Sequence, residues 1–200
     1  MNYQTISWFI YNTCSHCTIK FNDVPFQKQS RNKIPLYEIE HSILLNKSQR
    51  DKVAQAITHT HTRKFATPSL FVNVRFTDAN SQHNYVAGKE RAINRIMAYV
   101  RVGGTRTTAD FDDLAQRLSE AWDKVVTKNG GASKERQLNA VFVLGAITTG
   151  TESGFLLPRA GEDASWLKSN ATKFQELAKQ GDGDFAELVG EMRSRDDLAV

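Results

Sequence analysis

The sequence predicts an α/β (α+β) fold made of two fused β-α-β units, with helices added at the carboxyl end. Two observations support this prediction. A strand-like, a helical and a second strand-like segment follow one another over about residues 35–77, and the same order returns over about residues 92–147. Each unit is therefore expected to pair its two strands in parallel through a right-handed crossover. We expect a single sheet with two helices on one face, forming one domain over residues 35–160.

The first unit opens with Pro35–Ser42, which alternates in the manner of a strand. A proline is tolerated there because the first residue of a strand need not donate to the ladder. Asn46-Lys-Ser is a helix start signal, and the helical spacing of apolar residues predicts a helix from there to about Arg63. Thr67-Pro68 ends the helical segment, and Leu70–Phe76 alternates as the second strand.

The second unit repeats this order. Ala92–Val102 reads as a strand, and Thr107 and Thr108 cap a helix whose apolar residues recur every three or four positions. Leu138–Ile147 is predicted to be a buried strand. The remaining residues, 161–200, contain two helical stretches, Ala164–Lys179 and Asp184–Arg195, which we expect to form a helical tail packed on the domain.

The composition is that of an ordinary globular protein. The chain has 200 residues, of which 40% are hydrophobic and 24% charged. Two cysteines, and the lack of any run approaching ~20 apolar residues, favour a reducing, cytoplasmic location without a membrane span. The net charge of +4 does not indicate a nucleic-acid partner, because residues 1–34 hold four basic residues against one acid, and the remainder is nearly neutral.

Residues 1–34 differ from the rest of the chain. They are rich in Asn, Gln, Ser and Thr and show no apolar period, so we expect an atypical, disordered amino-terminal extension. Within it, Cys14-Ser-His-Cys17 resembles a redox or zinc motif. Zinc needs four ligands, and the sequence offers no second Cys/His pair at a suitable spacing. No metal is therefore predicted.

Several polar residues are candidates for chemistry. His59 and His61 end the first predicted helix, where surface capping is the common role of histidine and where an i, i+2 pair cannot face one metal. Arg101 and Arg106 flank a Val-Gly-Gly-Thr turn that opens a helix, which suits either a carboxylate-binding corner or ordinary surface charge. Glu152 lies in a loop after a strand, a frequent place for active-site residues.

Four segments together resemble the tautomerase superfamily, in particular the cis-3-chloroacrylic acid dehalogenase-like group and its fungal relatives. They are Pro35-Leu-Tyr-Glu-Ile, the helical stretch 54–61, the turn and helix of 101–117, and the loop 152–158. The resemblance covers about residues 35–160. It implies fused β-α-β units assembled as a homotrimer, with no cofactor and with chemistry at an amino-terminal proline.

The resemblance also implies a role for each candidate residue. Pro35 would be the acid/base, while His61, Arg101 and Arg106 would bind the carboxylate and carbonyl of the substrate, and Glu152 would activate water. The implied substrates are small unsaturated or 2-oxo carboxylates. Keto–enol tautomerisation is the first reaction expected, followed by hydration and hydrolytic dehalogenation.

Two departures from the family pattern bear on activity. Where the dehalogenases have an active-site tyrosine, this chain offers Phe142 or Val143. In addition, Pro35 follows Ile34, so its nitrogen belongs to an amide and cannot act as a base near neutral pH. An enzyme therefore requires that Pro35 be freed. The alternative is a catalytically silent, trimeric scaffold or interaction protein.

Overall fold

The computed structural model describes residues 35–128 and 133–198, which all belong to a compact unit spanning Asn32–Val200. The predicted extension over residues 1–34, with its Cys14–Cys17 motif, lies outside the described residues.

A four-stranded sheet carries the fold, with its strands in the order β2-β1-β5-β6. The strands are β1 (Leu36–His41), β2 (Asn73–Asp78), β5 (Arg95–Tyr99) and β6 (Ala140–Leu144). β1 pairs with β2 in parallel and β5 pairs with β6 in parallel, whereas the two central strands, β1 and β5, are antiparallel. The predicted pair of β-α-β units is thus confirmed, and the units join through their first strands.

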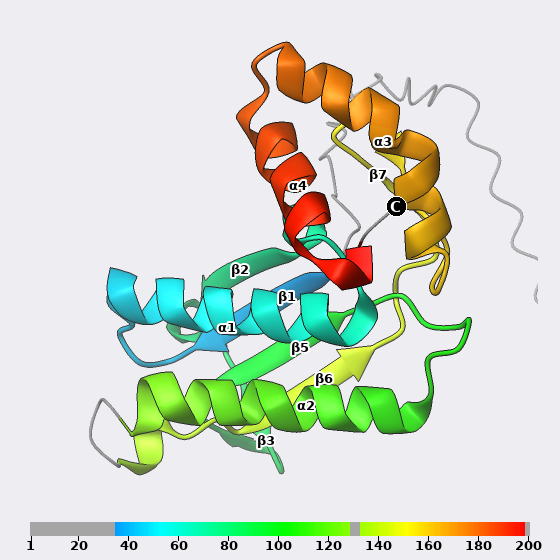
Figure 1. Ribbon diagram of the computed structural model, residues 1–200. Helices are drawn as coiled ribbons and strands as arrows, with labels where there is room; N and C mark the ends of the chain where they lie inside the picture. Colours follow the sequence, from blue (N-terminus) through cyan, green and yellow to red (C-terminus); the bar gives the residue numbers. More distant parts are fainter. Residues whose placement is uncertain (1–34, 129–132, 199–200) are drawn as a thin grey trace, which may run out of the picture. The chain divides into compact units, whose positions relative to one another are not determined.

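Helices α1 (Lys47–Phe65) and α2 (Thr108–Trp122) lie side by side across one face of the sheet (Figure 1). Both begin at the predicted caps, Asn46 and Thr107, whose side chains accept a hydrogen bond from the backbone N–H three residues later. A π-helical turn, Asp123–Thr127, continues α2. No helix in the described part of the chain is long and apolar enough to cross a membrane.

The main core lies between the sheet and these two helices. Alternation along β1 and β5 points Tyr37, Ile39, Ile96 and Ala98 toward the helices, and all four are fully buried. Leu114, Leu118 and Trp122 complete this core from α2, at the predicted spacing of three and four residues.

Some predicted elements differ from the observed ones. The strand expected from Leu70 starts at Asn73, because Ser69–Phe71 forms a 3-10 turn first. The strand expected to be buried, β6, is an edge strand, and its Phe142 is 48% exposed. Two short hairpins were not predicted. They are β3–β4 (Tyr85–Val86 and Lys89–Glu90) and β7–β8 (Thr151–Glu152 and Phe155–Leu156).

The carboxyl-terminal helices, α3 (Asp163–Lys179) and α4 (Gly183–Ser194), build a second core. It is largely aromatic: Phe155 of β8 lies 4.8 Å from Phe174 and 5.5 Å from Phe185, measured between ring centroids. Phe71, from the 3-10 turn before β2, belongs to the same cluster. The helices therefore pack on the loops at one edge of the sheet, namely the edge at which β1 and β2 begin and β5 and β6 end. Further 3-10 turns among the described residues are Ala79–Ser81, Lys134–Arg136 and Asp196–Leu198.

The topology brings the ends of six helices and strands to that edge. Leu36, at the start of β1, is paired both with Asn73 at the start of β2 and with Tyr99 at the end of β5. Tyr99 in turn pairs with Leu144 at the end of β6. Because α1 returns the chain from β1 to β2 and α2 leaves from β5, the end of α1 and the start of α2 reach this edge as well (Figure 1).

Candidate active site

All five candidate residues lie on the segments that meet at this edge. Pro35 precedes β1, His61 is in the last turns of α1, and Arg101 and Arg106 occupy the connection from β5 to α2. Glu152 is in β7, on the chain that follows β6. The topology of the two β-α-β units thus gathers residues that are far apart in sequence.

His61 is held inside the core by Tyr37, whose hydroxyl lies 2.6 Å from His61 Nδ1. His61 is fully buried, and burial, followed by the charges of Arg106 and Arg101, lowers its pKa to about 3. Burial likewise raises the pKa of Tyr37, so the phenol keeps its proton at neutral pH. The hydroxyl therefore donates to Nδ1, and the neutral imidazole carries its proton on Nε2.

The two arginines share one carboxylate, that of Asp163 at the start of α3. Arg101 Nη2 lies 2.6 Å from Asp163 Oδ1, and Arg106 Nη2 lies 3.2 Å from Asp163 Oδ2. Both arginines also donate hydrogen bonds to backbone oxygens. Arg101 Nη1 donates to Pro158 O at 2.7 Å, and Arg106 Nη1 donates to Arg101 O at 3.1 Å. The side chains of both arginines are less than a tenth exposed.

Arg106 also stacks on an aromatic ring. Its guanidinium carbon lies 4.5 Å from the centroid of Phe65, the last residue of α1, and Phe65 lies 4.9 Å from the ring of His61. A planar guanidinium over an aromatic face is a favourable cation–π arrangement. The stack therefore fixes Arg106 beside the histidine.

Glu152 is tied to the start of β1 through Asn73. The Asn73 side chain donates to Glu152 Oε1 at 3.2 Å, while its backbone N–H donates to Pro35 O at 2.9 Å. Burial raises the pKa of Glu152, and the bond from Asn73 opposes this shift. A carboxylate with a raised pKa thus lies beside the start of β2, next to the strand that follows Pro35.

The site has polar atoms without partners. Within residues 35–128 and 133–198, three buried side-chain nitrogen or oxygen atoms lack a hydrogen bond: His61 Nε2, Arg101 Nε and Glu152 Oε2. All three belong to candidate residues. Such atoms are uncommon in folded proteins and call for a reason, and a ligand with complementary polar groups is one.

These positions correct two expectations from the sequence. Surface capping is wrong for His61, which lies in the interior, whereas His59 is exposed. Ordinary surface charge is wrong for Arg101 and Arg106, because both side chains are buried against Asp163.

Tyr37, Asn73 and Asp163 were not predicted from the sequence. The strand alternation held one usable signal, because a residue two positions after Pro35 points to the same side of the sheet as Pro35 itself. The hydroxyl beside His61 comes from Tyr37, whereas Phe142 is half-exposed on β6 and Val143 packs on the main core.

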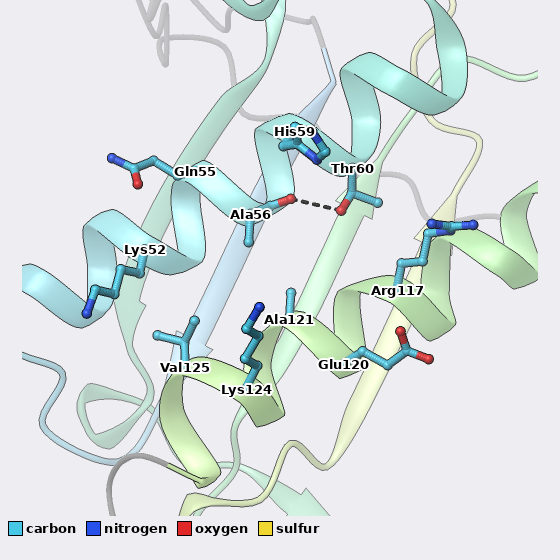
Figure 2. Close-up of a pocket in the computed structure, with 10 residues that line it drawn as sticks. All are labelled: Lys52, Gln55, Ala56, His59, Thr60, Arg117, Glu120, Ala121, Lys124 and Val125. Carbon is cyan, nitrogen blue, oxygen red and sulfur yellow. Dashed lines mark hydrogen bonds between the residues drawn. The ribbon is translucent and has the colours of Figure 1, made fainter.

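A groove between α1 and α2 is separate from this site (Figure 2). It is lined by Lys52, Gln55, Ala56, His59, Thr60, Arg117, Glu120, Ala121, Lys124 and Val125. None of Pro35, His61, Arg101, Arg106 and Glu152 contributes to it. The groove runs along the helices, whereas the candidate residues lie at the sheet edge.

Comparison with known families identifies the chain. The sequence profile of the family described as "Putative oxalocrotonate tautomerase enzyme" matches residues 34–171. The chain belongs to this tautomerase family. The match includes Pro35 and Asp163 and therefore spans the whole candidate site. Among curated protein sequences, none matches this tautomerase.

Several solved structures share the fold of this chain. The structure of N1, a member of the cis-3-chloroacrylic acid dehalogenase family, superposes with a TM-score of 0.58 at 25% identity, covering 73% of the tautomerase and 99% of N1. A probable enzyme from the thermophilic fungus Aspergillus fumigatus shares the fold, with a TM-score of 0.50 and 19% identity over 69% of this chain and 95% of its own. RhCC from Rhodococcus jostii RHA1 does so with a TM-score of 0.50 and 17% identity, over 68% and 96%.

Proposed function

We propose that this tautomerase acts on small unsaturated or 2-oxo carboxylates by acid/base chemistry at the amine of Pro35, with keto–enol tautomerisation as its basic reaction. The observation that carries the proposal is the set of three unpartnered, buried atoms, His61 Nε2, Arg101 Nε and Glu152 Oε2. Two are donors and one is a carboxylate oxygen, which suits an anionic ligand that also brings a proton or a water molecule.

Each group has a task that follows from its chemistry. The guanidinium groups of Arg101 and Arg106 bind the substrate carboxylate, and the neutral His61 donates from Nε2 to the carbonyl or enolate oxygen. In ketonisation, the protonated Pro35 amine delivers a proton to the carbon next to the enol, and the enol oxygen releases its proton to water. The neutral amine then regains a proton from water. The number of protons is unchanged over the cycle.

Glu152 extends this chemistry to water. Its Oε1 is held by Asn73, and Oε2 is the oxygen without a partner. A carboxylate whose pKa is raised by burial is a stronger base once it is ionised, and Oε2 is the atom that would take a proton from water. Hydration and hydrolytic dehalogenation are therefore proposed as the reactions that depend on Glu152.

Proline chemistry requires a free secondary amine. In the sequence, Pro35 is joined to Ile34 by an amide bond, so the proposed enzyme is the form in which this bond is absent. Pro35 itself is buried at the start of β1, with its carbonyl bonded to Asn73. The same strand then supplies Tyr37 to His61, so the amine lies two residues from the tyrosine that binds the histidine.

We also propose a homotrimer. The face of the sheet opposite α1 and α2 carries the residues that alternate with the core, among them Met97 and the half-exposed Phe142, which pair across β5 and β6. Tyr85 and Val86 of the β3–β4 hairpin are exposed as well. Apolar surface of this kind marks protein interfaces. Light scattering on the purified chain would test the state of assembly, and a monomer would contradict it.

Ketonisation of phenylenolpyruvate tests the proposed reaction. The chain is produced from Met-Pro35 onward, with Ile34→Met, so that aminopeptidase removal of the methionine exposes the proline. We expect kcat/KM to exceed that of the matched Pro35→Ala chain by about 100-fold, the usual contribution of a positioned acid/base group. Circular dichroism of both chains controls for folding.

The full-length chain, with the Ile34–Pro35 amide intact, is the second comparison. We expect it to match the Pro35→Ala chain. If the chain with free Pro35 is no more active than Pro35→Ala, the proposed enzymatic function is refuted for this substrate class. The silent, trimeric scaffold or interaction protein then becomes the better account.

A further inference from the structure

We infer that Asp163 is a positioning residue of this site: its carboxylate holds Arg101 and Arg106 together, so the first turn of α3 is part of the carboxylate-binding apparatus. The inference rests on the proposed function, because it concerns the arginines assigned there to the substrate. It adds a residue from the carboxyl-terminal helices, which the sequence suggested only as a tail packed on the domain.

The geometry divides the Asp163 carboxylate between the two cations. One oxygen lies 2.6 Å from Arg101 Nη2, and the other lies 3.2 Å from Arg106 Nη2. Two guanidinium groups repel each other. Burial, joined by the charge of Arg101, lowers the pKa of Arg106, whereas the charge of Asp163 opposes that shift. Asp163 therefore supplies the negative charge that allows two buried arginines to lie side by side before any ligand binds.

After this pairing, one nitrogen of the Arg101 guanidinium has no partner. Its Nη1 and Nη2 are taken by Pro158 O and Asp163, and Nε is buried without a partner. Arg101, Arg106 and Asp163 together carry a net charge of one positive unit. The cluster is thus a fixed donor arrangement that still favours one substrate carboxylate.

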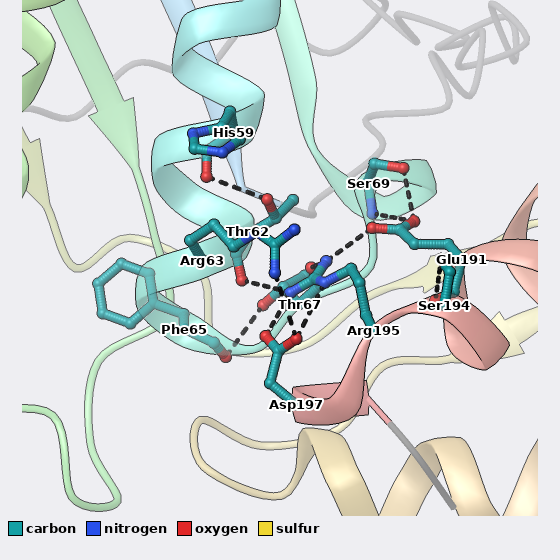
Figure 3. Close-up of polar contacts among 10 residues, drawn as sticks. All are labelled: His59, Thr62, Arg63, Phe65, Thr67, Ser69, Glu191, Ser194, Arg195 and Asp197. Atoms are coloured by element: carbon teal, nitrogen blue, oxygen red, sulfur yellow. Dashed lines mark hydrogen bonds and ion pairs between the residues drawn. The ribbon is translucent and has the colours of Figure 1, made fainter.

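The helix that carries Asp163 is itself anchored. Leu167 and Phe174 of α3 are buried in the aromatic core. α3 packs on α4, and just beyond α4 the chain binds the end of α1 through Arg195, which donates to Thr62 O at 3.0 Å and to Thr67 O at 3.2 Å (Figure 3). A carboxylate on so well packed a helix acts as a fixed counter-ion.

The loops on either side of the ion pairs touch through their backbones. A Cβ atom at Gly104, in the Arg101–Arg106 turn, would lie 2.4 Å from Ala160 O, just before α3. The left-handed conformation of Gly104, with φ of +62°, and its missing side chain allow this approach. The arginine turn and the start of α3 are therefore one packed unit.

Propanoate binding to the full-length chain tests the inference without any need for catalysis. NMR titration follows the Arg101 and Arg106 Nε–Hε signals, with wild type compared with Asp163→Asn. If Asp163 positions the arginines, Asp163→Asn weakens propanoate binding about tenfold and moves both Nε signals, although the variant has lost a negative charge. A charge effect alone would strengthen binding of the anion.

Glu162→Gln is the matched control. Glu162 is the exposed neighbour of Asp163, so this variant makes the same change of acid to amide one residue earlier. We expect its affinity and Nε signals to equal those of wild type. Asp163→Glu keeps the charge but displaces it by one methylene, and we expect an intermediate loss of about threefold. Asp163→Glu decides the question if Asp163→Asn does not fold.

Unchanged or tighter binding in Asp163→Asn overturns the inference, as do wild-type affinity and signals in Asp163→Glu. So does a wild-type chain that binds no propanoate. In the Met-Pro35 chain, Asp163→Asn should raise KM about tenfold with kcat within about threefold. Propanoate binding that depends on Asp163 in a chain without turnover would refute the proposed function alone. Turnover with the same KM in wild type and Asp163→Asn would refute the positioning role alone.

Discussion

The hydroxyl of Tyr37 lies 2.6 Å from Nδ1 of His61, and both side chains are fully buried. This pair fixes which nitrogen of the imidazole faces the site, because the phenol keeps its proton and gives the hydrogen bond. His61 Nε2–H is then a neutral donor next to two cations, which is the form suited to stabilising a developing enolate.

The buried His61 predicts how stability depends on pH. The His61 pKa is about 3 in the folded chain and 6.5 when the side chain is exposed. Between pH 3 and pH 6.5, His61 is therefore protonated in the unfolded chain and neutral in the folded chain. As pH falls from 6.5 toward 3, His61 should therefore remove about 1.4 kcal/mol of unfolding free energy per pH unit. Urea unfolding between pH 4 and 7 measures this slope.

His61→Gln should have a slope smaller by about one proton. His59→Gln is the matched control, because His59 is exposed two residues earlier on the same helix. Equal slopes for wild type and His61→Gln would contradict a neutral, buried His61.

The link from Asn73 to Glu152 predicts a second pH effect. Asn73→Leu removes the hydrogen bond to Glu152 Oε1 but keeps the backbone N–H that binds Pro35 O. Because that bond lowers the Glu152 pKa against the effect of burial, its loss should raise this pKa further. Carbon-13 NMR titration of the Glu152 carboxyl measures the shift, and Glu152→Gln identifies the signal. A pKa that stays or falls in Asn73→Leu would refute the link.

Arg195 should be the main clamp between the carboxyl-terminal helices and α1. It is buried and bonds two backbone oxygens as well as the carboxylates of Glu191 and Asp197 (Figure 3). Arg195→Met removes these hydrogen bonds and ion pairs and should lower the free energy of unfolding by about 3 kcal/mol in urea titrations. Arg193→Met, at an exposed position of α4, should stay within about 0.5 kcal/mol of wild type. Equal losses in the two variants would exclude a clamp.

Gly104 and Gly88 allow the contact between two loops to be tested. Both glycines have a positive φ, +62° at Gly104 and +71° at Gly88. A Cβ atom at Gly104 would overlap Ala160 O, whereas a Cβ atom at Gly88 would have no other atom within 4 Å. Each change to alanine should cost about 1 kcal/mol for its backbone conformation. Gly104→Ala should cost about 1–3 kcal/mol more for the overlap. Thermal and urea unfolding compare the two, and equal costs would contradict the packed contact.

Much of the fold could be predicted because local patterns and tertiary structure agree. The caps at Asn46 and Thr107 and the apolar spacing of α2 are local signals, and the repeat of strand, helix and strand implies the parallel pairs. β6 was misjudged because its apolar run reads the same at the centre or the edge of a sheet. Edge position depends on the order of strands, which no local pattern contains.

The site could be predicted only in part, for a related reason. His61, Arg101, Arg106 and Glu152 came from a family resemblance, since spacing alone favoured surface roles for the histidine and the arginines. Asp163 lies 57 residues beyond Arg106 in sequence and meets it only through the packing of α3. Partners set by tertiary contact carry no signal in a single sequence.

The central claim is that Pro35 works as a free amino-terminal amine. Peptide mapping of the protein purified from its source tests it most directly. Amines are labelled before digestion, which blocks the lysines, so trypsin cuts this region only after Arg31 and Arg50. The claim predicts a peptide that begins at Pro35 with a labelled α-amine and ends at Arg50. A peptide from Asn32 to Arg50 with an unlabelled α-amine, and no peptide beginning at Pro35, would contradict it.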